Sequence, residues 1–135
     1  MTTQGKWNLI GMFLLPVAVV IAAAIATANG VWNATSEVYI FLFQMNFGVM
    51  LLAAFFSWLL LRKAEGDRAR WFAVLPTVGP AIYGAVWYLW RSVFPAAVAP
   101  GAEYIGAVQY LAIAIVVLTV LVLLLRVTGI VSRTA

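Results

Sequence analysis

The amino-acid sequence predicts an all-α integral membrane protein, folded as an antiparallel bundle of four transmembrane helices. Of its 135 residues, 66% are hydrophobic and only 9% are charged, and the mean hydropathy is +1.07. The apolar residues form long unbroken runs, whereas the half-buried elements of soluble domains alternate with a period of 3.6 or 2 residues. Composition and pattern together indicate lipid as the surrounding solvent.

Four apolar segments account for most of the chain, and we place them at residues 7–28, 38–61, 71–94 and 104–125. Each has about the 20 residues that cross a ~30 Å hydrocarbon core. Backbone polar groups in lipid must be satisfied within the segment, so each should be helical. Short connectors make consecutive helices antiparallel neighbours, and residues 1–135 form a single transmembrane domain. The first segment also resembles a secretory signal, but its apolar core exceeds the ~7–15 residues of such signals.

Basic residues predict the direction of the four spans. Lys6 precedes the first span, four Lys or Arg lie between the second and third, and Arg126 and Arg133 follow the fourth. The connectors 29–37 and 95–103 contain neither Lys nor Arg. Because basic residues stay on the cytoplasmic side, both termini and the middle connector should be cytoplasmic. We expect a multi-pass protein of a plasma or inner membrane.

Proline makes the third span irregular, since Pro76 and Pro80 flank Gly79 within it. Each proline removes a backbone hydrogen bond and crowds the preceding turn, which predicts a kink at Pro76 and Pro80, with these three residues as the hinge. Transporters use broken helices to form substrate sites, but proline is widely tolerated in membrane helices, so a plain kink is the simpler interpretation.

Polar side chains inside the spans are the candidate functional residues, because they are costly in hydrocarbon. Those on spans two, three and four fall in one layer of the outer leaflet. The candidate ligand- or partner-binding residues are Gln44, Asn46, Tyr83, Trp87, Tyr88, Arg91, Gln109 and Glu103. A structural role is the alternative: amides act as hydrogen-bond links between helices, and Arg91 can reach the headgroups or pair with Glu103.

Helical spacing predicts which faces point inward or toward a partner. On span three one face carries the prolines and the polar or aromatic residues, and the opposite face suits lipid. The stripes predicted to point inward or toward a partner are Pro76, Pro80, Tyr83, Trp87 and Arg91 on span three, Asn46, Met50, Ala53 and Ser57 on span two, and Gln109, Ala112, Val116 and Thr119 on span four. The predicted lipid-facing residues of span three are Val78, Ile82, Val86, Leu89 and Val93.

Composition also narrows the chemistry. The chain has no Cys and no His and only four acidic residues, so we expect no metal site, no catalytic residues and no cofactor other than a bound lipid or quinone. The net charge of +4 is explained by membrane topology and does not indicate nucleic acid as a partner.

These observations favour a non-catalytic small subunit or assembly partner of a larger membrane complex. Its expected partners are membrane lipids, other membrane subunits or further copies of itself. A homo-oligomeric transporter or channel is one alternative: the chain resembles the small multidrug exporters in length and number of spans, but it lacks their acidic residue inside the membrane. A lipid- or quinone-binding protein, with Trp87, Tyr88 and Trp90 as walls, is the other.

Overall fold

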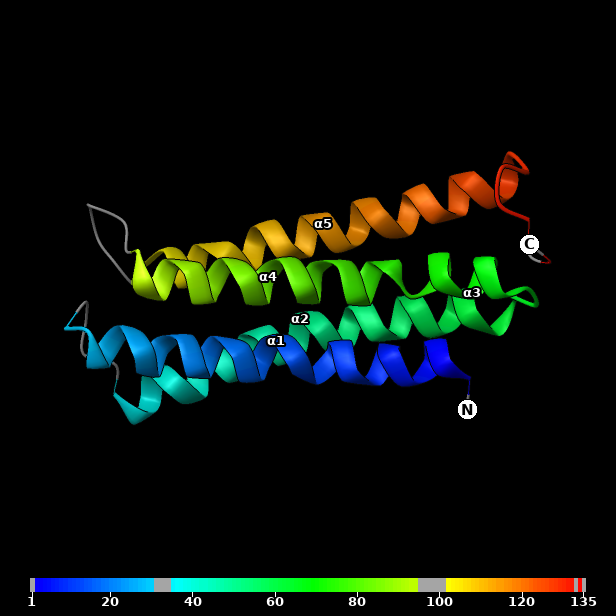
Figure 1. The fold of residues 1–135 in the computed structure, drawn as a ribbon. Helices are drawn as coiled ribbons and strands as arrows, with labels where there is room; N and C mark the ends of the chain where they lie inside the picture. Colours follow the sequence, from blue (N-terminus) through cyan, green and yellow to red (C-terminus); the bar gives the residue numbers. More distant parts are fainter. Residues whose placement is uncertain (1, 31–34, 95–101, 133, 135) are drawn as a thin grey trace.

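The computed structural model describes residues 2–30, 35–94, 102–132 and 134, with the backbone alone at 102, 103 and 105. These residues form five α-helices and no strand: α1 (Thr3–Ala28), α2 (Ser36–Arg62), α3 (Asp67–Ala73), α4 (Leu75–Val93) and α5 (Ala102–Val127). The four long helices lie side by side along a common direction (Figure 1). Both marked chain ends lie at the same end of the molecule as the turn between α2 and α3.

Threonine side chains begin the first two helices. The hydroxyl of Thr2 accepts a hydrogen bond from the amide of Gly5 at 3.1 Å, and that of Thr35 accepts one from Val38 at 3.4 Å. Such caps satisfy amides that have no partner inside the helix. After α1 the chain turns through Gly30, whose φ of 73° suits a residue without a Cβ. At 26 residues, α1 extends over roughly 39 Å at 1.5 Å per residue.

The segment predicted as a third span with a kink at its two prolines consists of two helices. α3 and α4 are bent by 53° at Val74, two residues before Pro76, and Pro80 lies inside α4 without interrupting it. Pro76 lacks an amide hydrogen and would crowd the preceding turn of a continuous helix, so the helix stops before it. A new helix then starts, with the amides of Thr77 and Val78 both bonded to the Val74 carbonyl at 3.1 and 2.9 Å. The bend therefore precedes the predicted hinge.

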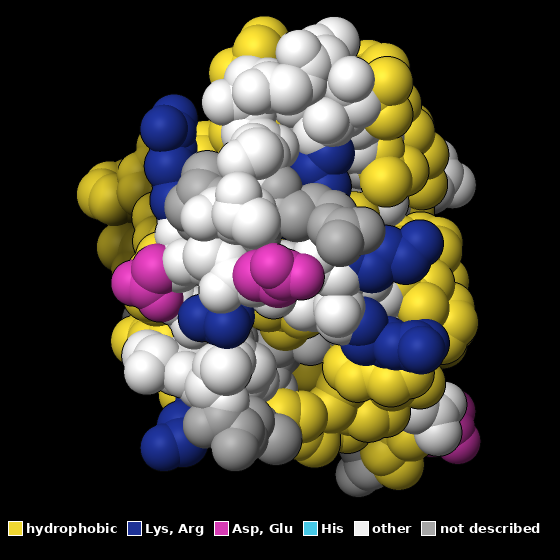
Figure 2. All heavy atoms as spheres, turned by 90° about the vertical axis from the view of Figure 1, so that its right-hand side faces the viewer, with side chains coloured by type: hydrophobic (Ala, Val, Ile, Leu, Met, Phe, Trp, Pro, Cys, Tyr) yellow, Lys and Arg dark blue, Asp and Glu magenta, His cyan; other side chains and the backbone are white. Residues whose placement is uncertain are grey.

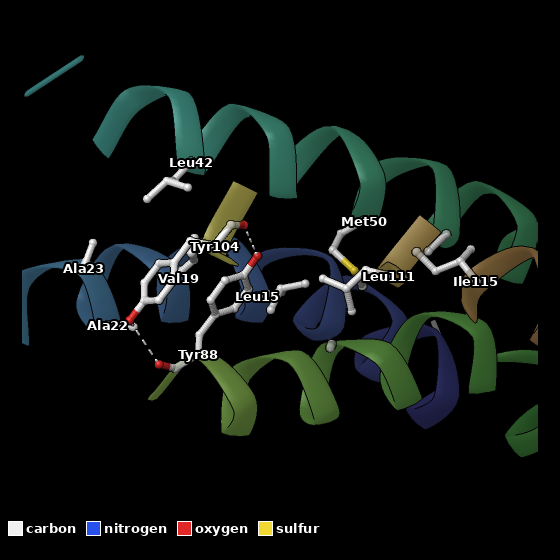
Figure 3. Close-up of a cluster of buried hydrophobic side chains, with 12 residues drawn as sticks. Leu15, Val19, Ala22, Ala23, Leu42, Met50, Tyr88, Tyr104, Leu111 and Ile115 are labelled. Atoms are coloured by element: carbon white, nitrogen blue, oxygen red, sulfur yellow. Dashed lines mark hydrogen bonds between the residues drawn. The ribbon is translucent and has the colours of Figure 1, made fainter. Parts of the chain in front are cut away.

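The core lies where α1, α2 and α4 pack together, with α5 on α2 and α4. Ala18, Ala22 and Ala26 form a buried strip on α1, and small side chains let neighbouring helices approach closely. Figure 3 shows the largest cluster of buried side chains. Its members come from α1, α2, α4 and α5, and include Leu15, Val19, Leu42, Met50, Ala81, Tyr88, Tyr104, Leu111 and Ile115.

The outer surface of the long helices is largely apolar. Three helices, α1, α2 and residues 106–127 of α5, are long and apolar enough to cross a membrane. The bent pair α3–α4 makes a fourth if it counts as one span. On α4 the predicted lipid-facing residues Ile82, Val86 and Val93 are more than half exposed, as the helical spacing predicts.

Charged side chains gather at one end of the molecule. Figure 2 views the end that carries the termini, where several Lys and Arg side chains are spread among polar atoms, with hydrophobic atoms at the edges. The basic residues of the described chain at this end are Lys6, Arg62, Lys63, Arg68, Arg70 and Arg126. Arg91, near the end of α4, lies toward the opposite end.

Candidate functional site

The eight residues predicted as a site do not form one inward-facing layer. Seven have described side chains. Asn46 and Tyr88 are buried, Trp87 and Arg91 are half-buried, and Gln44, Tyr83 and Gln109 are exposed. The side chain of Glu103 lies outside the described residues. The predicted hinge residues Pro76 and Pro80 are buried and Gly79 is half-buried. Of the two orientations predicted for its stripe, inward or toward a partner, Tyr83 does not have the inward one, because 73% of its surface is exposed.

Two tyrosines and an asparagine form a buried polar network in the half of the molecule distant from the basic end. The hydroxyl of Tyr88 donates to the backbone carbonyl of Tyr104 at 3.1 Å and lies 3.3 Å from Oδ1 of Asn46. The Tyr104 hydroxyl in turn lies 3.5 Å from the Tyr88 carbonyl (Figure 3). The two rings meet edge to face with centroids 5.2 Å apart. This network joins α2, α4 and α5, and its polar groups form hydrogen bonds between these helices.

The face of α5 that carries Gln109 does not point inward. Val116 is 51% exposed and Gln109 is also exposed. Among the described side chains of α5, the buried ones are Tyr104, Val108, Leu111, Ile115 and Val122. Large apolar and aromatic side chains offer more contact area than one amide, so they decide which face packs. Tyr104, which is not among the predicted site residues, is thus a central network residue.

A second polar cluster lies toward the basic end. Thr77 donates to the Ser57 hydroxyl at 2.7 Å, linking α4 to α2. Asn8 donates from Nδ2 to the carbonyl of Ala54 at 3.2 Å. Asn8 is not among the predicted site residues, although the spacing of Gln4, Asn8 and Gly11 along one face of α1 indicates a polar or small face suited to packing. Like the first cluster, this one connects helices.

Apolar side chains separate the two polar clusters. The intervening layer consists of Leu15, Met50, Ala81, Leu111 and Ile115, none of which is more than 6% exposed. Within the described residues, the interior therefore offers no continuous row of polar groups along the molecule. Water and ions need such groups to replace their hydration shells.

A groove of about 730 Å³ lies between α4 and α5. The exposed rings of Tyr83 and Tyr110 border it, so it opens toward the side of the molecule. On α4 it is lined by Gly79, Pro80, Tyr83, Gly84, Trp87 and Tyr88, and on α5 by Gly106, Ala107, Tyr110, Leu111, Ala114 and Leu118. Its volume falls within the about 300–1,000 Å³ of small-molecule sites, which are also mostly apolar and aromatic.

Glycine creates much of this space. A Cβ placed on Gly106 would meet no described atom within 4 Å, and one on Gly79 would meet only side-chain atoms at 3.6 and 3.7 Å. At 1.5 Å per residue, the lining from Gly79 to Tyr88 and from Gly106 to Leu118 covers roughly 14 to 18 Å. That length is about half of a ~30 Å hydrocarbon core. The groove thus matches a chain within one leaflet better than a helix that crosses both.

Arg91 lies one helical turn beyond the groove. Its guanidinium carbon is 6.0 Å from the ring centroid of Trp87, which lines the groove, and 4.7 Å from that of Trp90. Cations are attracted to the faces of indole rings, which holds the guanidinium near the groove's outer end. Of the predicted site residues, Tyr83, Trp87, Tyr88 and Arg91 are thus brought together at or near the groove.

Known proteins give no further guide, since no family model, no curated protein and no solved structure matches the chain. Among the described residues, no group of three or more His, Cys, Asp or Glu could hold a metal ion. The chemistry that the groove itself offers is burial of an apolar chain between aromatic walls, with a cationic side chain near one end.

Proposed function

We propose that this chain is a multi-pass protein of a plasma or inner membrane, with four spans in an antiparallel bundle and both termini in the cytoplasm. The three long apolar helices and the bent pair α3–α4 support the number of spans. The gathering of Lys and Arg at the end with both termini supports the orientation (Figure 2), because basic residues resist translocation.

Within that membrane, we propose that the protein binds a lipid or quinone chain without catalysing a reaction. The groove between α4 and α5 carries this proposal, because it is apolar, borders the lipid-facing surface and matches one leaflet in length. Transport along the axis would require the apolar layer around Leu15, Met50 and Ile115 to open. The geometry favours binding of a molecule in the groove at the side of the bundle over conduction of water or ions along its axis.

The role of subunit or assembly partner, which the sequence favours, is compatible with such binding. α5 packs mainly on α2 and α4, and Ile113, Val117 and Leu124 are each more than half exposed on its outer side. These side chains suit lipid or another membrane helix equally well. Native mass measurement after mild extraction would separate the two cases: a second protein in stoichiometric amount supports the subunit role, and lipid alone supports the lipid-binding role.

Filling the groove tests the lipid-binding proposal. Gly106→Leu places four carbons into the groove without a clash at the Cβ, since no described atom lies within 4 Å of that position. We expect the affinity for a phospholipid, titrated into purified protein and followed by native mass spectrometry, to fall by about fivefold or more, since losing roughly 1 kcal/mol of apolar burial has that effect.

Gly48→Leu is the matched control. Gly48 also has no described atom within 4 Å of an added Cβ, it is exposed on α2, and it does not line the groove. This variant should bind phospholipid as the original protein does. Equal affinities for the original protein and both variants would contradict the proposal that the groove is the binding site.

A further inference from the structure

We propose that the groove selects a phospholipid with an anionic headgroup, and that Arg91 is the residue that recognises it. This inference rests on the proposed lipid-binding function, and it specifies which lipid and which end of the groove. The apolar lining would hold one acyl chain, and the guanidinium of Arg91 would contact the phosphate, whose negative charge is not balanced by a cation in such a headgroup.

The position of Arg91 supports this assignment. The apolar lining ends at Trp87 and Tyr88 on α4, and Arg91 follows Trp87 by one turn on the same face. Its guanidinium carbon lies 6.0 Å from the Trp87 ring centroid. A chain lying along the groove therefore brings its polar end to the level of Arg91, which lies in the last turn of α4.

The chemistry of arginine adds to the geometric argument. The guanidinium is planar, always charged and carries five N–H donors, so it can keep its present contacts while donating to phosphate oxygens. Two such bonds to one phosphate are common and fix its orientation. The contact with the Trp90 ring at 4.7 Å holds the side chain in place before a lipid arrives, which reduces the entropy lost on binding.

The basic end of the molecule would not provide the same selection. Arg62 also lies over an indole ring, with its guanidinium carbon 4.9 Å from the Trp58 centroid. It is the last residue of α2, at the end opposite to Arg91, and neither Arg62 nor Trp58 lines the groove. An anionic lipid attracted there would lie away from the groove that is proposed to hold the acyl chain.

The experiment compares phosphatidylglycerol and phosphatidylcholine with identical acyl chains, each titrated into the purified full-length protein in mild detergent and followed by native mass spectrometry. We expect phosphatidylglycerol to bind the original protein about tenfold more tightly, as one charge-assisted contact typically allows. In Arg91→Gln the two lipids should bind within about twofold of each other, because the cation is lost. In Arg62→Gln, which removes a cation over an indole ring elsewhere, the tenfold preference should remain.

The variants distinguish failure of the inference from failure of the proposed function. If Gly106→Leu weakens both lipids but Arg91→Gln keeps the original preference, the groove binds lipid and the role of Arg91 is refuted. If Arg62→Gln abolishes the preference as fully as Arg91→Gln, the preference reflects net charge, and the inference also fails. If Gly106→Leu weakens neither lipid, the groove itself is not the site. Thermal unfolding of each variant confirms that the protein compared is folded.

Discussion

The two interfaces of α4 use the same kinds of residue to opposite effect. Toward α1, glycine permits close contact: a Cβ on Gly11 would lie 3.0 Å from a methyl carbon of Thr77, and one on Gly84 would lie 2.8 Å from Leu15. Toward α5, glycine leaves room, since a Cβ on Gly106 would meet no described atom within 4 Å. One helix therefore has a closely packed side and a side with a groove.

Because of this difference, we expect the α1 side of α4 to determine the stability of the protein and the α5 side to determine its binding. The α1 side is closely packed because glycine and alanine let backbones approach, and in lipid such packing replaces the hydrophobic effect as the source of helix association. On the α5 side, the hydrogen bond from Tyr88 to Tyr104 holds the helices together near one end of the groove. Substitutions on the first side should reduce stability, and substitutions on the second should change binding.

The largest expected effect is that of Gly11→Leu. The added side chain would force α1 away from Thr77, whose methyl carbon lies only 3.0 Å from the new Cβ position and whose backbone already fills the space behind it. Overpacking costs more than the gain in helix propensity from replacing glycine, so we expect a net loss of about 2 kcal/mol in the free energy of unfolding. Unfolding in detergent, followed by circular dichroism, measures this loss.

Gly106→Leu provides the counterpart on the α5 side. It should leave stability unchanged or raise it by up to about 1 kcal/mol, since a helical glycine is replaced by a better helix former without a clash. The contrast between the two interfaces would be refuted if both leucine variants lost stability to the same degree.

A smaller effect is expected for Tyr88→Phe. This variant removes the hydroxyl that donates to the Tyr104 carbonyl and lies near Asn46, while the ring and its edge-to-face contact remain. Hydrogen bonds between membrane helices average about 0.6 kcal/mol and reach about 1.7 kcal/mol, and this hydroxyl, which lies near two acceptors, should contribute about 1 kcal/mol. We expect that loss of stability, together with faster hydrogen exchange in the first turns of α5.

Tyr83→Phe is the control for this hydroxyl. The Tyr83 ring is 73% exposed at the edge of the groove, so removing its hydroxyl should change neither stability nor exchange in α5. If the Tyr83 variant accelerated exchange as much as the Tyr88 variant, the buried network would not be what holds α5.

Sequence patterns predicted the helices better than their contacts. Long apolar runs fix where helices form, because backbone and lipid requirements act locally. The buried stripe of α2, with Asn46, Met50, Ala53 and Ser57, was predictable because it combines helical spacing with small and polar side chains. The position of the bend at Val74 required the structure, since proline disrupts the turn before it and the exact residue depends on packing.

The candidate site could be predicted only in part. Trp87, Tyr88 and Arg91 were identified from polarity and spacing, but a groove depends on how two helices diverge, and one helix's sequence does not contain that information. Gly106 was missed for this reason, because a glycine that leaves space and one that permits contact look the same in sequence. Gln109 does not face inward, because Tyr104 and Leu111 offer a larger contact area than one amide side chain does.

The smallest expected effect concerns the hydrogen bond between α4 and α2 on the closely packed side. Thr77→Val keeps the shape of the side chain but removes the hydroxyl that donates to Ser57 at 2.7 Å. The Ser57 hydroxyl can then bond to the carbonyl four residues before it in α2, which limits the loss. We expect a loss of about 0.6 kcal/mol, the average for such bonds between membrane helices.

A double-mutant cycle with Ser57→Ala isolates this interaction, and Thr119→Val serves as the control. The Thr119 hydroxyl donates at 2.8 Å to the Ile115 carbonyl within its own helix, so its removal should show no coupling to Ser57. A coupling energy between Thr77 and Ser57 well above about 2 kcal/mol would exceed what one such bond supplies. The stability of the α1, α2 and α4 core would then depend on its polar contacts more than on close packing at Gly11 and Gly84, which reverses the order of effects expected here.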